Sequence, residues 1–286
     1  MKIGIIGSEN SHTKAIAKTI NIDQKVKGFS VDYVWGETDK LAREASRDGQ
    51  IPNVVKQPHR MLGKIDAVIV DHRHPKYHLK AVWPFMEAGV PVFVDKPFCY
   101  RSAEGKQFLK TAKRKGTPVT SFSILTHQAS FRRFQRKLET LGDVLTGYTY
   151  GPCDLKSKWG GVFFYGIHQV DMVLHAFGFN VKSAGIVRNP PNAVAQLLYP
   201  SGLIVNMSLI KEGVHEFGIG AAGTEGEVHI QVKKDTDPYL RGIKTFTQMF
   251  KTGQEPLTRE EMLKPVQVLE ALEKSVKSGR LEKVPK

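Results

Sequence analysis

Near its beginning the chain reads Ile3-Gly4-Ile5-Ile6-Gly7-Ser8-Glu9-Asn10-Ser11-His12, an apolar run that leads through a glycine turn into a stretch with helical spacing. The same order recurs through the first 120 residues or so, most clearly at the apolar runs Ala67–Val70 and Val92–Val94. Short strands that alternate with helices are typical of a parallel sheet with crossover helices. We therefore predict an α/β domain over residues 1–122.

The pattern changes after about residue 122. Longer apolar runs, several of them alternating in polarity, follow at 145–150, 194–198, 203–209 and 228–232, and few helices separate them. This pattern favours a mostly antiparallel or mixed sheet. We predict a second domain over residues 123–286, of the α+β class, which ends in a helix over 259–277.

The composition is that of a soluble globular protein, with 41% apolar and 24% charged residues. No apolar run approaches the length of about eighteen residues that a membrane span needs, and the first residues read as a strand, not a signal peptide. Cys99 and Cys153 form no C-x-x-C pair, which favours a reduced, cytoplasmic setting. A net charge of +14 is common in proteins that bind nucleic acid, because lysine and arginine neutralise phosphates. Because the basic residues are spread along helical stretches, we expect a solvated basic surface and neither a nucleic-acid nor a membrane partner.

The glycine turn is the first candidate site. A dinucleotide-binding turn has the pattern G-x-G-x-x-G, and here only Gly7 is present, because Glu9 and His12 occupy the other two glycine places. Side chains of the turn can still donate hydrogen bonds, and a helix start favours an anion. An ordinary capped helix start is the alternative. Glu37, about thirty residues after Gly7, could bind a ribose diol and would favour NAD over NADP, or it could be a plain surface glutamate.

Two later loops also follow apolar strands. The first is Asp71-His72-Arg73-His74-Pro75-Lys76-Tyr77-His78, and the second is Asp95-Lys96-Pro97-Phe98. In an open parallel sheet, ligands bind beyond the carboxyl ends of the strands. The three histidines of the first loop could bind a metal ion. Because no acidic or sulfur ligand lies at a spacing known from metal sites, we predict no metal site here. Lys96 could hydrogen-bond a substrate hydroxyl and exchange its proton. Lysine–proline pairs in ordinary surface turns are the alternative.

A third candidate lies in the second half, at Gly160-Gly161-Val162-Phe163-Phe164-Tyr165-Gly166-Ile167-His168-Gln169-Val170-Asp171. From Ile167 the spacing predicts an amphipathic helix, with His168, Asp171 and His175 opposite its apolar face. His168 could act as a general acid or base, with Asp171 orienting it or merely capping the helix. A structural histidine remains the alternative.

These motifs, taken together, resemble the glucose–fructose oxidoreductase/inositol dehydrogenase (Gfo/Idh/MocA) family almost end to end. Residues 95–98 resemble its E-K-P signature, and residues 160–171 resemble its G-G…G-x-H-x-x-D helix. Residues 223–226 resemble its G-T-E-G turn, and residues 268–285 its closing helix and tail. The sequence departs from the family at the two lost glycines and at Phe164, where members often have an aspartate.

The resemblance implies a Rossmann-type N-terminal domain and a C-terminal domain whose open sheet commonly builds dimers or tetramers. It implies hydride transfer between NAD(P) and a hydroxyl carbon of a sugar, polyol or related compound, with Lys96 and His168 as the reactive pair. We expect NAD as the cofactor, with NADP left open. The residues expected to bind the cofactor are Gly7, Ser8, Glu9, Asn10, Glu37, His72, Arg73, His74, His78 and Asp95. Those expected to bind substrate are Lys96, Trp159, Tyr165 and His168.

Two other functions stay open at this point. One is a non-catalytic sensor or scaffold that binds a sugar or nucleotide, which the lost glycines and Phe164 favour. The other is metal-dependent chemistry that uses His72, His74, His78 and His168.

Overall fold

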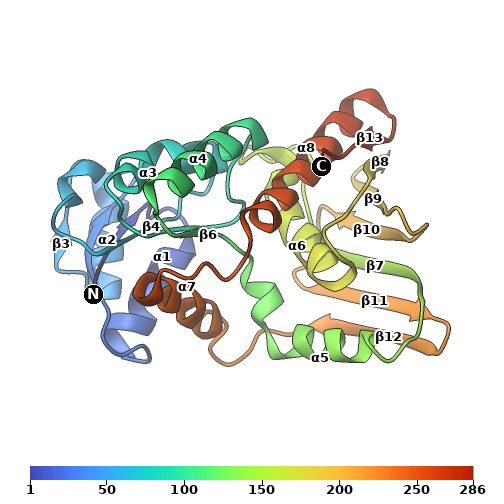
Figure 1. Ribbon diagram of the computed structural model, residues 1–286, viewed down its shortest axis with the longest axis horizontal. Coiled ribbons are helices and arrows are strands. Elements are labelled where there is room, and N and C mark those ends of the chain that lie inside the picture. Colours follow the sequence, from blue (N-terminus) through green and yellow to red (C-terminus); the bar gives the residue numbers. More distant parts are fainter. Residues whose placement is uncertain (286) are drawn as a thin grey trace. The chain divides into compact units, whose positions relative to one another are not determined.

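The computed structural model describes residues 1–285, and the chain divides into two compact units (Figure 1). The first unit comprises residues 1–122 together with 239–262. The second comprises residues 123–238 together with the segment that starts at Leu263. In the part of the chain that the structure describes, no helix is both long enough and apolar enough to cross a membrane.

The first unit contains a six-stranded parallel sheet in the order β3-β2-β1-β4-β5-β6. Its strands are β1 (Lys2–Ile6), β2 (Ser30–Trp35), β3 (Asn53–Val54), β4 (Ala67–Val70), β5 (Val92–Val94) and β6 (Val119–Thr120). The order reverses between β1 and β4, and such a switch point is where doubly wound sheets bind their ligands. The predicted parallel α/β fold is therefore confirmed, and the loops after β1, β4 and β5 begin at one edge of the sheet.

Crossover helices connect these strands, and local sequence fixes where they start and end. They are α1 (Ser11–Ala17), which continues as a π-helical turn η1 (Lys18–Ile22), α2 (Asp39–Gly49), η2 (Pro58–Met61), η3 (Pro75–Tyr77), α3 (His78–Glu87) and α4 (Ser102–Lys115). Thr38 caps α2 by accepting a hydrogen bond of 3.2 Å from the amide of Leu41. Gly116, with a φ of +68°, ends α4 in the left-handed conformation that glycine adopts most easily.

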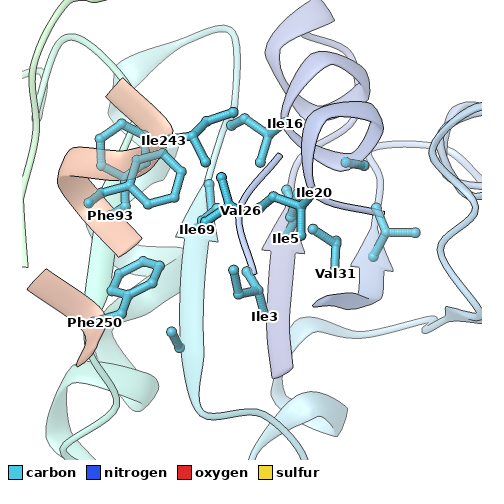
Figure 2. Close-up of a cluster of buried hydrophobic side chains, with 14 of the residues drawn as sticks. Ile3, Ile5, Ile16, Ile20, Val26, Val31, Ile69, Phe93, Ile243 and Phe250 are labelled. Carbon is cyan, nitrogen blue, oxygen red and sulfur yellow. The ribbon is translucent and has the colours of Figure 1, made fainter. Parts of the chain in front are cut away.

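The core of the first unit includes a helix from much later in the chain (Figure 2). Helix α7 (Leu240–Thr252) inserts Ile243, Phe246 and Phe250 among the strand residues, and the rings of Phe93 and Phe246 stack with centroids 4.4 Å apart. Residues 239–262 were assigned to the second domain from the sequence. They belong to the first unit because their apolar face is buried there, and each large side chain so buried stabilises the fold by roughly 1.5–3 kcal/mol.

The second unit contains a seven-stranded sheet in the order β12-β11-β7-β10-β9-β8-β13. Its strands are β7 (Val144–Pro152), β8 (Ser183–Asn189), β9 (Asn192–Leu198), β10 (Ile204–Ile210), β11 (Phe217–Gly223), β12 (Gly226–Val232) and β13 (Glu282–Lys283). Only β7 and β10 pair in parallel; every other neighbouring pair is antiparallel. The predicted mostly antiparallel sheet is confirmed. Besides α7, the helical elements after β6 are η4 (Ile124–His127), α5 (Ala129–Leu138), η5 (Gly161–Phe163), α6 (Gly166–Phe177) and α8 (Arg259–Ser278).

The environment of α6 differs from the prediction. An amphipathic helix was expected, but every residue from Gly166 to Leu174 is buried. Of its polar residues, Gln169 contacts the sheet, whereas His168 and Asp171 contact Ser123. Gln169 accepts a hydrogen bond of 2.8 Å from the hydroxyl of Thr149, and its amide donates to the carbonyl oxygens of Gly151 and Ser208 at 3.2 and 3.3 Å. These hydrogen bonds offset the free energy that it costs to remove the polar side chain of Gln169 from water.

Candidate functional site

The loop after β1 touches the loop after β4, and Gly7 makes this contact possible. Its φ is +109°, and a Cβ atom there would lie 2.7 Å from the carbonyl carbon of Asp71 and 2.8 Å from the amide nitrogen of His72. Both are backbone atoms that no rotamer change can move away. The Gly7 amide also donates to the carbonyl of Trp35 at 2.9 Å, so the turn is held against β2 as well. Glycine is therefore required here by close backbone packing.

Glu37, at the end of β2, holds this turn from the other side. Its Oε2 accepts hydrogen bonds of 2.9 Å from the amides of Ser8 and Glu9, and its Oε1 lies 3.0 Å from Nδ1 of His72. Burial raises the pKa of Glu37, but the hydrogen bonds from His72 and Ser8 outweigh it and leave the pKa below its usual value. Glu37 is therefore an anion, and 24% of its side chain is exposed. The structure thus brings together four residues predicted to bind the cofactor: Ser8, Glu9, Glu37 and His72.

A second, more deeply buried cluster lies between the ends of β1, β4 and β5. The Asn10 side-chain amide donates to Oδ1 of Asp71 at 2.8 Å and to Oδ2 of Asp95 at 3.3 Å. Nδ1 of His12 lies 2.9 Å from Oδ1 of Asp95. Sequence reasoning included Asn10 and Asp95 as cofactor residues, treated His12 only as a lost glycine, and gave no role to Thr13 or Asp71. The available signal was the position of these polar residues directly after adjacent parallel strands.

Hydrogen-bond geometry indicates which carboxyl group of the cluster carries a proton. The hydroxyl of Thr13 has one hydrogen but lies 2.8 Å from the carbonyl oxygen of Gly7 and 2.7 Å from Oδ2 of Asp71. Both contacts are satisfied at once if Thr13 donates to Gly7 and a protonated Asp71 donates to Thr13. Burial, reinforced by the charge of Asp95, raises the pKa of Asp71 well above its usual value. Asp71 is thus the neutral partner.

Asp95 is the anion of the pair. Burial raises its pKa, but the charges of His12 and Lys96 and the hydrogen bond from His12 outweigh burial and hold the pKa below its usual range. Lys96 Nζ lies 3.4 Å from Oδ2 of Asp95, and 13% of the lysine side chain is exposed. The lysine amine is therefore partly desolvated and placed beside one buried negative charge. Such a position suits an amine that exchanges a proton with a ligand.

The contacts of His12, Asp71 and Asp95 favour a hydrogen-bond network over a metal site. Among residues 1–285, His12, Asp71 and Asp95 are the one group of three or more histidine, cysteine or acidic residues whose ligand atoms all lie within 4.8 Å of one another. Those atoms already hydrogen-bond to each other, to Asn10 and to Thr13. The cluster is accordingly a hydrogen-bond network, and the prediction of no metal site stays a prediction.

The histidines of the loop after β4 bind three different groups. His72 contacts Glu37, and Nδ1 of His74 accepts from the amide of Lys76 at 3.2 Å. His78 is fully buried, with Nδ1 3.0 Å from the carbonyl oxygen of Pro97 and Nε2 2.8 Å from that of His72. Burial lowers the pKa of His78 to about 4. His78 therefore connects the loop after β4 to the loop after β5. Arg73, which was also predicted to bind the cofactor, is half-buried in the loop after β4.

The candidate residues of the second unit surround His168. Its Nδ1 lies 2.7 Å from Oγ of Ser123, and the amide of Ser123 donates to Oδ2 of Asp171 at 2.8 Å. Asp171, the partner expected from the sequence, thus fixes the backbone of the serine that contacts His168. Ser123 was missed because it belongs to no motif and lies 45 residues away in sequence.

The rings of Tyr165 and Phe217 pack against this histidine, and Phe164 and Trp159 extend the aromatic group from Tyr165. Tyr165, with a φ of +67°, is 43% exposed, and its ring centroid lies 5.8 Å from that of His168. A positive φ at a non-glycine residue is uncommon and is often found at functional sites. Phe164 contacts the Tyr165 ring edge-on at 4.7 Å and lies 6.5 Å from Trp159. The phenylalanine that replaces the family's frequent aspartate is therefore part of an aromatic group.

Comparison with known proteins places this geometry in a family. Residues 1–122 match the model described as "Oxidoreductase family, NAD-binding Rossmann fold", of the Gfo/Idh/MocA group. The N-terminal domain belongs to the Gfo/Idh/MocA family. The family match ends at Phe122, where the first segment of the first unit also ends.

Individual relatives extend this result. The chain is 27% identical over 149 residues to the uncharacterised oxidoreductase YhhX of Escherichia coli K12, a match that covers 46% of this chain and 43% of that protein. The match thus spans less than half the length of the curated relative. A probable dehydrogenase from Thermotoga maritima has a TM-score of 0.82 at 19% identity, covering 99% of both chains. Scyllo-inositol dehydrogenase from Lactobacillus casei, solved with NAD(H) and scyllo-inositol, has a TM-score of 0.85 at 17% identity, also covering 99% of both. At these identities the structures establish the fold of the whole chain.

The residues of the first unit fit the family's cofactor. Asn10, at the start of α1, makes no side-chain cap and the first turn contains no acidic residue, so the helix start offers its amides to an anion. The hydroxyl of Ser8 is buried without a hydrogen-bond partner among the residues that the structure describes. Together with the partly exposed carboxylate of Glu37, these groups have the chemistry needed to hold a diphosphate and a ribose diol, and their assignment to NAD stays a prediction.

Proposed function

We propose that this protein is an NAD-dependent dehydrogenase or reductase that acts on a hydroxyl carbon of a sugar, polyol or related small molecule. The observation that carries the proposal is the position of Lys96. Lys96 comes shortly after strand β5 in a domain that matches an NAD-binding family model. Its amine lies 3.4 Å from the buried Asp95 carboxylate. A proton-exchanging group is needed there, because oxidation of an alcohol releases a proton as well as a hydride.

The roles of the chain's own residues follow from their contacts. Glu37 would bind the ribose hydroxyls and the start of α1 the diphosphate. Bound NAD would supply the acceptor for the hydride that leaves the substrate carbon. In that direction the hydroxyl proton passes to the neutral amine of Lys96 as the carbonyl forms, and the ammonium returns it in the reverse direction. In the second unit, His168, with Nδ1 2.7 Å from Ser123, is the other group that we propose as a general acid or base.

The substrate class rests on similarity and on the aromatic surroundings of His168. The Lactobacillus casei relative was solved with scyllo-inositol. Aromatic rings, such as those of Trp159 and Tyr165, give apolar faces against which a polyol ring can lie, while His168 of the same unit supplies a polar contact. These features support a carbohydrate-like substrate and leave its identity to experiment.

We also propose that the protein forms a homo-dimer or homo-tetramer through the sheet of the second unit. Even-numbered residues of β7, β9 and β10 lie on the face opposite Thr149, which contacts α6. On that face Tyr148, Val194 and Ile204 are each at least 40% exposed. Apolar side chains gathered on an exposed sheet face are typical of interfaces, and light scattering would give the mass of the assembly.

The decisive experiment compares Lys96→Met with Lys106→Met, which removes an exposed lysine of α4 from the same unit. NADH binding, followed by fluorescence, should stay close to wild type in both. Turnover on the best substrate of a sugar and polyol panel should fall roughly 10²-fold or more in Lys96→Met alone. Full turnover in Lys96→Met would reject the role of the lysine.

A non-catalytic sensor is the second candidate, and it is favoured by Phe164 and by the low exposure of His168, which is 7%. The same titration separates the two functions. A sensor that has lost the cofactor would give no saturable change in NADH fluorescence, whereas a dehydrogenase requires one.

A further inference from the structure

His12 occupies a place where a dinucleotide-binding turn normally has glycine, and its side chain is directed at a specific partner. Nδ1 of the imidazole lies 2.9 Å from Oδ1 of Asp95, and only 12% of the side chain is exposed. The ring of Tyr239, from the same unit, packs edge-on against the imidazole with centroids 5.2 Å apart. A histidine packed and hydrogen-bonded in this way is held in one orientation.

Asp95 connects His12 to Lys96. One carboxylate oxygen, Oδ1, contacts His12, and the other, Oδ2, lies 3.4 Å from Lys96 Nζ and 3.3 Å from the Asn10 amide. Because Asp71 is the neutral partner, Asp95 is the one negative charge of the cluster. The two basic side chains therefore share a single carboxylate from opposite sides.

We propose that His12 is a positioning residue that acts on Lys96 through Asp95, by fixing the carboxylate and by sharing its charge. The inference rests on the proposed function of Lys96 as the proton-exchanging group. A hydrogen bond from His12 withdraws charge from Asp95, and a protonated imidazole does so more strongly, so Lys96 then releases its proton more easily. Without His12 the whole charge of Asp95 acts on the ammonium form of Lys96 and stabilises it.

The other groups that face the pair are few. Besides His12 of α1, these groups are Asn10, which precedes α1, and Asp71, which lies in the loop after β4 and is neutral. The last is His78 of α3, whose pKa burial lowers to about 4. Above pH 6 His78 does not change charge, and Asp71 is present in every variant. The difference in Lys96 labelling between the variants therefore reports on His12 and its contact with Asp95.

The test measures the proton equilibrium of Lys96 directly. The wild-type protein and the variants His12→Ala, His12→Asn and His59→Ala are labelled with trace acetic anhydride between pH 6 and pH 11, and acetylation of Lys96 is quantified by peptide mass spectrometry. Asparagine can donate its side-chain amide to Asp95 at about the place of the imidazole Nδ1, and His59 is an exposed histidine of η2 in the same unit.

We expect His12→Ala to raise the midpoint of Lys96 labelling by about one pH unit, which is roughly tenfold slower labelling at a fixed pH below the midpoint. His12→Asn should recover most of this shift, and His59→Ala should label like wild type. A folded His12→Ala protein with wild-type labelling would overturn the inference. If that variant does not fold, the ratio of wild-type to His12→Asn rates must still change with pH across the range in which an imidazole titrates. A constant ratio would overturn it.

This experiment is independent of turnover, because labelling needs neither NAD nor substrate. A Lys96→Met protein that keeps its activity would reject the proposed function and leave the labelling result standing. Conversely, unchanged labelling in both His12 variants would reject the link between His12 and Lys96 while leaving the dehydrogenase proposal intact.

Discussion

Replacing Gly7 with alanine tests whether the turn after β1 depends on close backbone packing or only on a flexible residue. The change has two separable penalties. A left-handed backbone costs a residue with a Cβ about 1–2 kcal/mol. The new Cβ would also lie 2.7 Å from the carbonyl carbon and 2.9 Å from the carbonyl oxygen of Asp71. Moving that backbone is an overpacking penalty of roughly 1–3 kcal/mol. The free energy of unfolding of the first unit should therefore fall by about 2–5 kcal/mol.

Gly89→Ala is the matched control, because Gly89 has a φ of +78° and open space where a Cβ would lie. It should show only the backbone penalty, about 1–2 kcal/mol. Urea unfolding followed by circular dichroism gives both values, and the difference between them is the clash. NADH affinity should fall in Gly7→Ala alone, since the displaced backbone carries His72, which holds Glu37. Equal destabilisation in the two variants would refute the packing argument.

Three further predictions concern single side chains. Glu37→Gln should lower the ratio of the NADPH to the NADH dissociation constant about tenfold, because removing one partly exposed charge from beside a 2′-phosphate is worth about 1.4 kcal/mol. An unchanged ratio in fluorescence titrations would count against the ribose site. Ser123→Ala should lower kcat about fivefold with NADH binding unchanged, since His168 loses a hydrogen bond worth about 1 kcal/mol. Ser123→Thr should restore kcat. Burial raises the pKa of the Cys153 thiol to about 12, so only about 10⁻⁴ of it is thiolate at pH 8; Ellman's reagent should label Cys153 only after unfolding, and rapid native labelling would contradict this burial.

The strands of the first unit could be predicted from the sequence because their signal is local. Strands β4 and β5 start and end at the predicted residues, since short apolar runs buried on both faces can be recognised without knowing their neighbours. Helix α7 was missed, although Ile243, Phe246 and Phe250 have helical spacing. Its position in the first unit has no local signal, because nothing in residues 239–262 indicates that they pack beside Phe93.

Site residues divide in the same way. The rule that ligands bind beyond the carboxyl ends of parallel strands selected Glu37, His72 and Lys96. The partners that orient them could not be found by that rule. Thr13 contacts Asp71 across 58 residues of sequence, and Ser123 contacts His168 across 45. Such pairs are formed by the fold and leave no spacing to read.

The lost glycines of the turn illustrate the physical content of a fingerprint. Gly7 is indispensable because its neighbours are backbone atoms of another strand end, and the left-handed φ adds to that requirement. The other two places are subject to different contacts: the amide of Glu9 donates to Glu37, and the imidazole of His12 reaches Asp95. At position 12 the side chain adds a contact to Asp95, and at position 9 the backbone amide makes its contact whatever the side chain, whereas at Gly7 a side chain would have to displace a strand end. The number of glycines that remain is therefore a poor measure of whether such a turn still binds a dinucleotide; the contacts made by the replacing residues are the better one.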